Sequence, residues 1–181
     1  MKNPDPDTVI LKYVDGIHRK VVLNKTVERA IGINPVITNG IYLFEIIYKN
    51  IYNHQGTGIV KASYSIPKQC NPHYKFSLND NMNIICFDAY AGQIWYKGQE
   101  TSGNSKYKDG QKIGLQLDME KGTLHFFIDD IQQPVFVRGI NEPVRFFGHI
   151  YDGGASFTIV SFRKLYDAAI YTLPNEKVID W

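Results

Sequence analysis

The sequence has few of the features that mark specialised protein classes. Only two of its 181 residues are cysteines, Cys70 and Cys86, so we expect reduced, buried thiols in a cytoplasmic protein rather than a disulfide scaffold. The formal net charge is +2, and no basic stripe typical of nucleic-acid binding is present. No apolar run approaches the roughly 18 to 20 residues that cross a bilayer, and the polar, proline-containing segment 1–7 is unlike a signal peptide. The sequence therefore predicts binding to neither nucleic acid nor membrane.

Aromatic residues, in contrast, are abundant. They make up 13% of the chain, with 12 tyrosines and 10 phenylalanines, and they favour strands. Tyrosine is also a residue that recognition loops use as an anchor. The length suits one domain with a substantial core, so we treat residues 1–181 as a single domain and a monomer.

Two alternating segments near the middle of the chain give the strongest structural signal. In residues 112–118 (KIGLQLD), the side chains of Ile113, Leu115 and Leu117 share one face. In residues 123–128 (TLHFFI), the apolar side chains again alternate. The polar stretch 119–122 between them ends in glycine, which suits a short hairpin loop. Period-two alternation places one face of each strand on a core, so we predict a central antiparallel hairpin.

Further strands are predicted on both sides of this hairpin, about ten short strands in all, which favours an all-β sandwich. Residues 30–40 are interrupted by Pro35 and end in a turn signal. Residues 63–82 form the longest irregular stretch, and loops of that length are often functional. Residues 164–170 are predicted to form one or two helical turns within a short helical or irregular tail, and Trp181 is expected to fold back on the core. The predicted strands are residues 9–13, 20–23, 41–48, 56–61, 84–88, 93–97, 112–118, 123–128, 135–137, 144–151 and 156–162.

Several motifs, taken in order, resemble those of the SPRY domain family. Residues 109–118 (DGQKIGLQLD) are similar to its G-D-x-I-G-(V/C)-x-(L/V)-D signature, and residues 122–126 (GTLHF) are similar to its return strand. Each motif alone is weak, but together, in the right order and with compatible spacing, they make a strong case for the fold. The other matching segments are residues 40–45 (GIYLFE), 56–60 (GTGIV), 142–147 (EPVRFF) and 157–160 (FTIV).

The resemblance implies a bent, jelly-roll-like or concanavalin-like sandwich of two antiparallel sheets. Its core would cover about residues 31–162, with flanking strands in residues 1–30 and a tail in residues 163–181. It also implies a non-enzymatic protein-interaction module whose edge loops bind a peptide or protein partner. Relatives occur in ubiquitin-ligase subunits, in scaffold proteins and in ryanodine receptors, so a role in substrate recruitment is a natural expectation.

The sequence departs from the family pattern in two places. Where the family commonly has Asn-Gly after the return strand, this chain has Asp129 and Asp130. Aspartate adopts positive φ less readily than glycine, so we expect a longer turn or another turn type. The family's Gly-Trp pair is replaced in the segment 61–65 (KASYS), which leaves the chemistry of the rim open.

The residues that could support catalysis or bind a metal are better explained by structural roles. Asp118 and Glu120 lie at a strand end, where a turn role is favoured over a glycosidase carboxylate pair. Cys70 and His73 have a zinc-like spacing, but a structural site requires four ligands. We therefore predict no catalytic residue, no metal and no cofactor.

Binding residues are instead sought among the loop aromatics, because interface hot spots favour tyrosine, tryptophan and arginine. Tyr74 and Tyr107 also lie outside the predicted strands and are further loop tyrosines. Trp95, in contrast, is expected in the core. A rigid sandwich would hold loop side chains in place and so reduce the entropy lost on binding. The predicted partner-binding residues are Tyr52, Asn53, Tyr64, Tyr90, Arg138 and Tyr151.

Two other functions remain open at this stage. A lectin-like sandwich would stack exposed tyrosines or tryptophans on a sugar face. A hydrolase would need two acids about 5 to 10 Å apart in one groove.

Overall fold

The predicted central hairpin is present in the computed structural model, which describes residues 3, 5–15, 17–52, 55–73 and 82–181. Strands β9 (Lys112–Asp118) and β10 (Thr123–Ile128) pair antiparallel, with Asp118 opposite Thr123 and a four-residue loop between them. The Asp118 carboxylate closes this loop by accepting the backbone N–H groups of Glu120 and Lys121, each at 2.9 Å. The acid at this strand end therefore has a turn-forming role.

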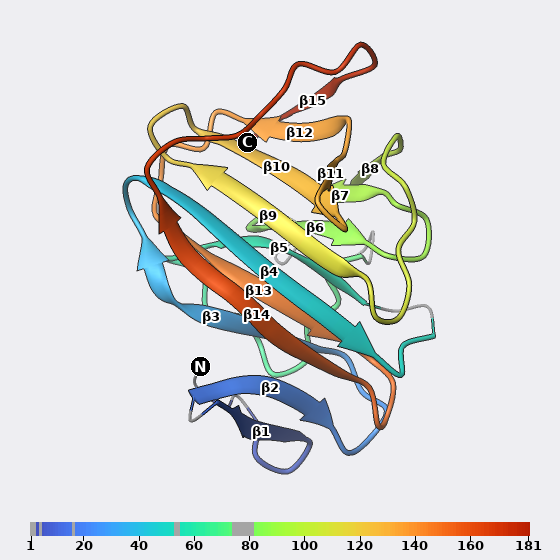
Figure 1. Ribbon diagram of the computed structural model, residues 1–181. Coiled ribbons are helices and arrows are strands. Elements are labelled where there is room, and N and C mark those ends of the chain that lie inside the picture. The colour runs from blue at the N-terminus through green and yellow to red at the C-terminus, as the bar shows by residue number, and fades with distance from the viewer. Residues whose placement is uncertain (1–2, 4, 16, 53–54, 74–81) are drawn as a thin grey trace.

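Two sheets pack face to face, and the nine-stranded sheet lies in front in Figure 1. Its order is β1-β2-β14-β4-β9-β10-β12-β15, and β11 (Ile131–Gln132) pairs with β10. All of its pairings are antiparallel except that of β12 with β15. Its remaining strands are β1 (Val9–Val14), β2 (Ile17–Leu23), β4 (Ile41–Lys49), β12 (Val135–Arg138), β14 (Ser156–Leu165) and β15 (Lys177–Asp180).

The six-stranded sheet has the order β3-β13-β5-β6-β7-β8 and lies behind the first sheet in Figure 1. Its edge strand β3 continues through Pro35, with a register irregularity against β13. Proline is tolerated there because an edge strand has no second neighbour that needs its missing N–H. The strands are β3 (Arg29–Ile37), β5 (Gly56–Lys61), β6 (Ile84–Asp88), β7 (Ile94–Tyr96), β8 (Gln99–Thr101) and β13 (Val144–Ile150).

The core lies between the two sheets and uses the faces that the alternation predicts. Ile113, Leu115 and Leu117 of β9 are fully buried in it. Across the interface, the rings of Phe44 and Phe146 stack with centroids 4.8 Å apart. Sequence periodicity therefore located the inner face of the central hairpin correctly, and the all-β sandwich is confirmed.

A second, smaller cluster covers the outer face of the six-stranded sheet. Its buried residues alternate along the strands with core residues, so they lie on the opposite side. Trp95 is half-buried and packs on this cluster rather than in the core, contrary to expectation. Tyr64 and Ile66, from the segment after β5, pack there as well. The cluster itself consists of Ala30, Val60, Cys70, Ile84, Cys86 and Phe147.

The C-terminal tail is irregular, and the predicted helical turns over residues 164–170 are wrong. Lys164 and Leu165 instead extend β14 and pair with Tyr42 and Ile41 of β4. The described residues contain no helix, and hence none that is long and apolar enough to cross a membrane. Strand β15, which the sequence did not predict, joins β12. Trp181 then folds back as expected and stacks on Tyr96, with ring centroids 5.3 Å apart.

Candidate functional site

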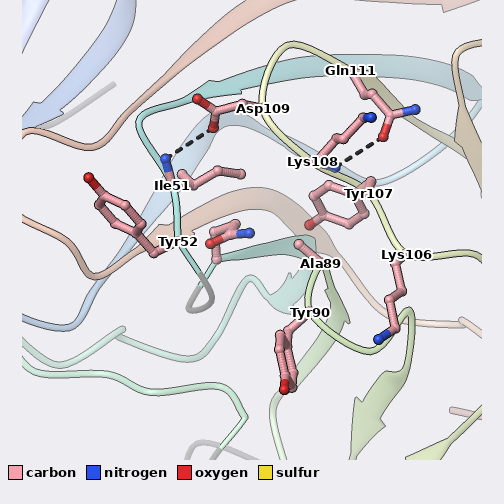
Figure 2. Close-up of a pocket in the computed structure, with 10 residues that line it drawn as sticks. Ile51, Tyr52, Ala89, Tyr90, Lys106, Tyr107, Lys108, Asp109 and Gln111 are labelled. Carbon is pink, nitrogen blue, oxygen red and sulfur yellow. Dashed lines mark hydrogen bonds between the residues drawn. The ribbon is translucent and has the colours of Figure 1, made fainter.

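Three loops at one end of the sandwich enclose a cavity of about 470 Å³, shown in Figure 2. They follow β4, connect β6 to β7, and connect β8 to β9. We call this cavity the tyrosine pocket. It is lined by Ile51, Tyr52, Gln55, Ala89, Tyr90, Lys106, Tyr107, Lys108, Asp109 and Gln111.

Two tyrosines from different loops stand at its rim. The side chains of Tyr52 and Tyr90 are 77% and 60% exposed, although rings of this size are usually at least partly covered in a folded chain. Lys106 Nζ lies 5.3 Å from the ring centroid of Tyr90, a distance suited to a cation–π contact. The rim therefore combines aromatic surface with positive charge.

The floor of the pocket is buried and partly polar. The Tyr107 hydroxyl donates a hydrogen bond to the backbone carbonyl of Phe87 at 3.0 Å, and burial raises the pKa of this phenol well above its usual range. Beside it, the side chain of Gln55 is only 3% exposed. Its Oε1 atom has no hydrogen-bond partner among the residues that the structure describes. A buried acceptor without a donor is costly, so this atom would gain from a donor supplied by a ligand.

Two carboxylates tie the loops around the pocket to one another. Asp109 accepts the backbone N–H groups of Asn50 at 2.7 Å and of Ile51 at 3.0 Å. The backbone N–H of Tyr52 points to Asp152 Oδ2 at 3.3 Å. These bonds hold the loop after β4 against two other loops, so the backbone beneath Tyr52 is fixed before any partner arrives.

The structure brings together only some of the predicted binding residues. Tyr52 and Tyr90 share the tyrosine pocket, and Tyr151 is half-buried next to Asp152, the residue that holds the Tyr52 backbone. Tyr64 lies elsewhere, in a cavity on the outer face of the six-stranded sheet. Arg138 lies at the end of β12, where its Nε is 2.6 Å from Asp180 Oδ1 of β15.

Asn53 and Tyr74 fall outside the described residues. Tyr107, which had been grouped with the exposed loop tyrosines, is only 5% exposed and forms the floor instead.

Sequence reasoning missed several residues of the pocket. Gln55, Lys106, Lys108 and Asp109 were not singled out, although the last three lie in a lysine-containing segment between two predicted strands. The only usable signal was the presence of Tyr107 among these lysines. Which loops meet is decided by strand order, and that order is not written in local sequence.

The described residues do not form a metal site. They contain no group of three or more histidine, cysteine, aspartate or glutamate side chains that could hold a metal ion. His73, considered with Cys70 for zinc, instead places Nε2 at 3.0 Å from Cys86 Sγ. Burial raises the pKa of that Cys86 thiol well above its usual range, so the thiol is protonated at neutral pH.

The sequence and the fold were compared with those of known proteins. No protein-family model and no curated protein matches the sequence. The fold is similar to that of the SPRY domain of human HERC1, with a TM-score of 0.66 and 15% identity over 86% of this chain and 95% of that one. It is similarly close to the PSpry domain of TRIM65, with a TM-score of 0.65 and 14% identity over 87% of this chain and 90% of that one.

Stonustoxin is also similar, with a TM-score of 0.61 and 18% identity over 86% of this chain but only 26% of the toxin chain. At such low sequence identities, the structural similarity is evidence for the fold alone. The ordered motifs and the three-dimensional arrangement agree, and the chain has a SPRY-like fold.

Proposed function

We propose that this chain is a non-enzymatic interaction module that binds a peptide segment or a protein partner in the tyrosine pocket. One observation carries the proposal: the exposed side chains of Tyr52 and Tyr90, from two different loops, line one cavity. Tyrosines in such positions are typical interface hot spots. The SPRY-like fold supports a protein partner, because the family resemblance implies this use of its edge loops.

The mechanism is recognition by a rigid scaffold. The Asp109 carboxylate already fixes the loop below Tyr52, so little loop entropy is lost when a partner binds. An extended peptide would pack apolar or aromatic side chains between the two tyrosine rings. A donor group of the peptide would satisfy Gln55 Oε1, and acidic residues would be attracted by Lys106 and Lys108.

The proposal extends to the cellular role of the chain. We place the chain in the cytoplasm as a monomer, in keeping with its buried cysteines Cys70 and Cys86, which form no disulfide. There it would recruit a partner for a ubiquitin ligase or a scaffold protein. A lectin-like function is the competing proposal, because two exposed tyrosine rings beside lysines also suit stacking on a sugar.

The test is a peptide selection followed by affinity measurement. Peptides would be selected by phage display on the intact chain, and the best binder would be titrated against variants by fluorescence anisotropy. Tyr52→Ala and Tyr90→Ala should each weaken binding by about tenfold or more, the size typical of hot-spot residues. Tyr166→Ala is the matched control, because that ring is fully exposed and lies outside the pocket.

The results of these measurements distinguish peptide binding in the tyrosine pocket from the lectin-like function. Unchanged affinity in both pocket variants, with their fold intact, would place the binding surface elsewhere. A glycan array that gives saturable binding sensitive to the same two variants, with no selected peptide, would favour the lectin-like function.

A further inference from the structure

A second cavity, of about 570 Å³, lies on the outer face of the six-stranded sheet. It shares no described residue with the tyrosine pocket. It is formed by β3, by β13 and by the segment that follows β5. We call it the arginine pocket. It is lined by Asn3, Gly32, Asn34, Ala62, Tyr64, Ser65, Ile66, Lys68 and Arg145.

Arg145 is the central charged group of this cavity, and its hydrogen-bonding capacity is poorly used. Its Nη1 donates to the backbone carbonyl of Ala62 at 3.1 Å. Its Nε is buried and has no hydrogen-bond partner within the described part of the chain, and no ion pair involves Arg145 there. A guanidinium offers five N–H donors in a fixed plane, so the donors of its two terminal nitrogens that Ala62 does not use are left for an acceptor that enters the cavity.

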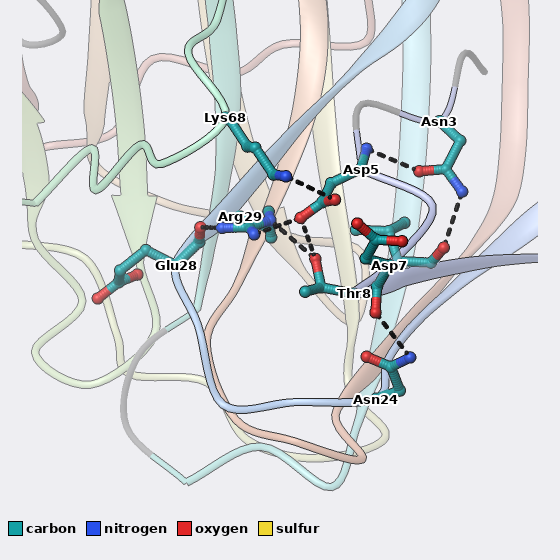
Figure 3. Close-up of polar contacts among 9 residues, drawn as sticks. Asn3, Asp5, Asp7, Thr8, Asn24, Glu28, Arg29 and Lys68 are labelled. Atoms are coloured by element: carbon teal, nitrogen blue, oxygen red, sulfur yellow. Dashed lines mark hydrogen bonds and ion pairs between the residues drawn. The ribbon is translucent and has the colours of Figure 1, made fainter.

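The neighbouring acid is already occupied by other cations. Figure 3 shows Asp5 between Arg29 and Lys68. Asp5 Oδ2 is 2.5 Å from Arg29 Nη2, and Oδ1 is 3.0 Å from Lys68 Nζ. Arg29 and Lys68 therefore share this carboxylate, and among the described residues no acid forms an ion pair with Arg145.

The rest of the lining fits the stem of an acidic side chain. Ala62, Ile66 and Gly32 contribute apolar surface next to Arg145, and the Ser65 hydroxyl adds a polar group. The side chain of Lys68 is 63% exposed, so solvent screens its charge, and the guanidinium of Arg145 is the main charge that a ligand would meet inside the cavity. A carboxylate, with a single charge and two oxygens, matches this better than a phosphate that carries about two charges.

We propose that the arginine pocket binds a carboxylate side chain of an acidic peptide segment, with the guanidinium of Arg145 as the main donor. This is a second binding surface, and it does not depend on the tyrosine pocket. A partner that engages both surfaces would gain affinity from their linkage.

The test uses NMR titration of the full chain with short peptides as defined probes. The acetylated amide Gly-Glu-Glu-Gly should shift the Arg145 Nε–Hε signal and the backbone amides of Ala62 and Ser65. The matched glutamine peptide should leave them unchanged. Arg145→Ala should weaken binding of the glutamate peptide by about tenfold or more, as expected when charge-assisted hydrogen bonds are lost. Arg163→Ala removes the same charge from an exposed position on β14, in the other sheet, and should bind like the parent.

A second variant keeps the test decisive if Arg145→Ala does not fold. Arg145→Lys retains the positive charge but loses the planar fork, and it should bind the glutamate peptide more weakly than the parent. Equal affinity of parent and Arg145→Lys, equal shifts with the glutamine peptide, or equal loss in Arg163→Ala would each overturn the proposal. Tighter binding of a Gly-phosphoserine-phosphoserine-Gly peptide would also overturn it, because the site would then be a phosphate site.

Discussion

Arg29 and Asp5 form a buried ion pair, with Nη2 and Oδ2 2.5 Å apart and side chains only 5% and 2% exposed. Thr8 joins them: its hydroxyl donates to Asp5 Oδ2 at 2.6 Å and accepts from Arg29 Nε at 3.0 Å (Figure 3). The contact connects the segment before β1 to the first residue of β3. The N-terminal flank is therefore fastened to the six-stranded sheet by polar groups.

This pair predicts a specific dependence of stability on pH. Hydrogen bonds from Thr8, and then from Arg29 and Lys68, hold the pKa of Asp5 well below its usual range. A carboxyl whose pKa is depressed by folding stabilises the folded state above its unfolded pKa of about 3.9, and this contribution is lost as the pH falls below that value. Asp5→Asn should thus be clearly less stable than the parent at pH 7, and the difference should shrink between about pH 4 and pH 2.

Urea unfolding of both chains at a series of pH values measures this difference. Asp7→Asn is a suitable control, because Asp7 is an exposed neighbour and makes no ion pair among the described residues. A gap between parent and Asp5→Asn that stays constant down to pH 2 would contradict the assigned role.

Gly58 gives a prediction about packing. An added Cβ at Gly58 on β5 would lie 1.9 Å from the carbonyl oxygen of Ile85 on β6. Since backbone atoms must move to relieve such a clash, Gly58→Ala should lower the free energy of unfolding by at least about 2 kcal/mol.

Gly32→Ala is the control for this change. Its Cβ would meet only Ile66 Cδ1, at an ordinary 3.5 Å, so its stability should stay within about 1 kcal/mol of the parent. Denaturant unfolding compares the two variants directly. Equal stability of both would mean that β5 and β6 are not held as closely as described.

The layers of the fold were predictable because their signal is local. Alternation in residues 112–118 and 123–128 requires only that one face be buried, and the core faces of β9 and β10 are buried as expected. Strand β15 was not predictable in this way. It is four residues long, largely exposed, and depends on parallel pairing with β12, so it has no amphipathic pattern of its own.

The candidate site was only half predictable for a related reason. Composition identifies loop tyrosines, but it does not say which loops meet. Tyr52 and Tyr90 converge because β5 and β6 are neighbours in one sheet, whereas Tyr64 packs on the far face of that sheet. Lys106 joins the pocket through the long connection from β8 to β9, which crosses from one sheet to the other. These are properties of strand order, and local sequence does not encode them.

The turn at Asp129 and Asp130 was expected to be longer or of another type, and that expectation is wrong. Ile128 pairs with Ile131, so the loop has two residues, and both aspartates have positive φ, 48° and 68°. This is the conformation that a type I′ hairpin requires. Asp129 is compensated by local bonds: its carboxylate accepts the Lys112 N–H at 2.9 Å and the Gln111 side-chain amide at 2.8 Å. The same bonds lower its pKa.

The positive φ of Asp130 is supported by fewer local bonds than that of Asp129. Asp130 is therefore the better position for a substitution that stabilises the turn. Its side chain is 77% exposed and forms an ion pair with Lys112 at 2.8 Å, an interaction of small worth at the surface. Glycine adopts positive φ without the steric cost that aspartate bears, although it loses more entropy on folding. Asp130→Gly should therefore raise the free energy of unfolding by about 0.5 kcal/mol. Asp130→Asn removes the charge while keeping a side chain, and should lie between glycine and the parent. Urea unfolding at neutral pH orders the three chains; a glycine variant less stable than the parent would show that the Lys112 ion pair outweighs the backbone strain.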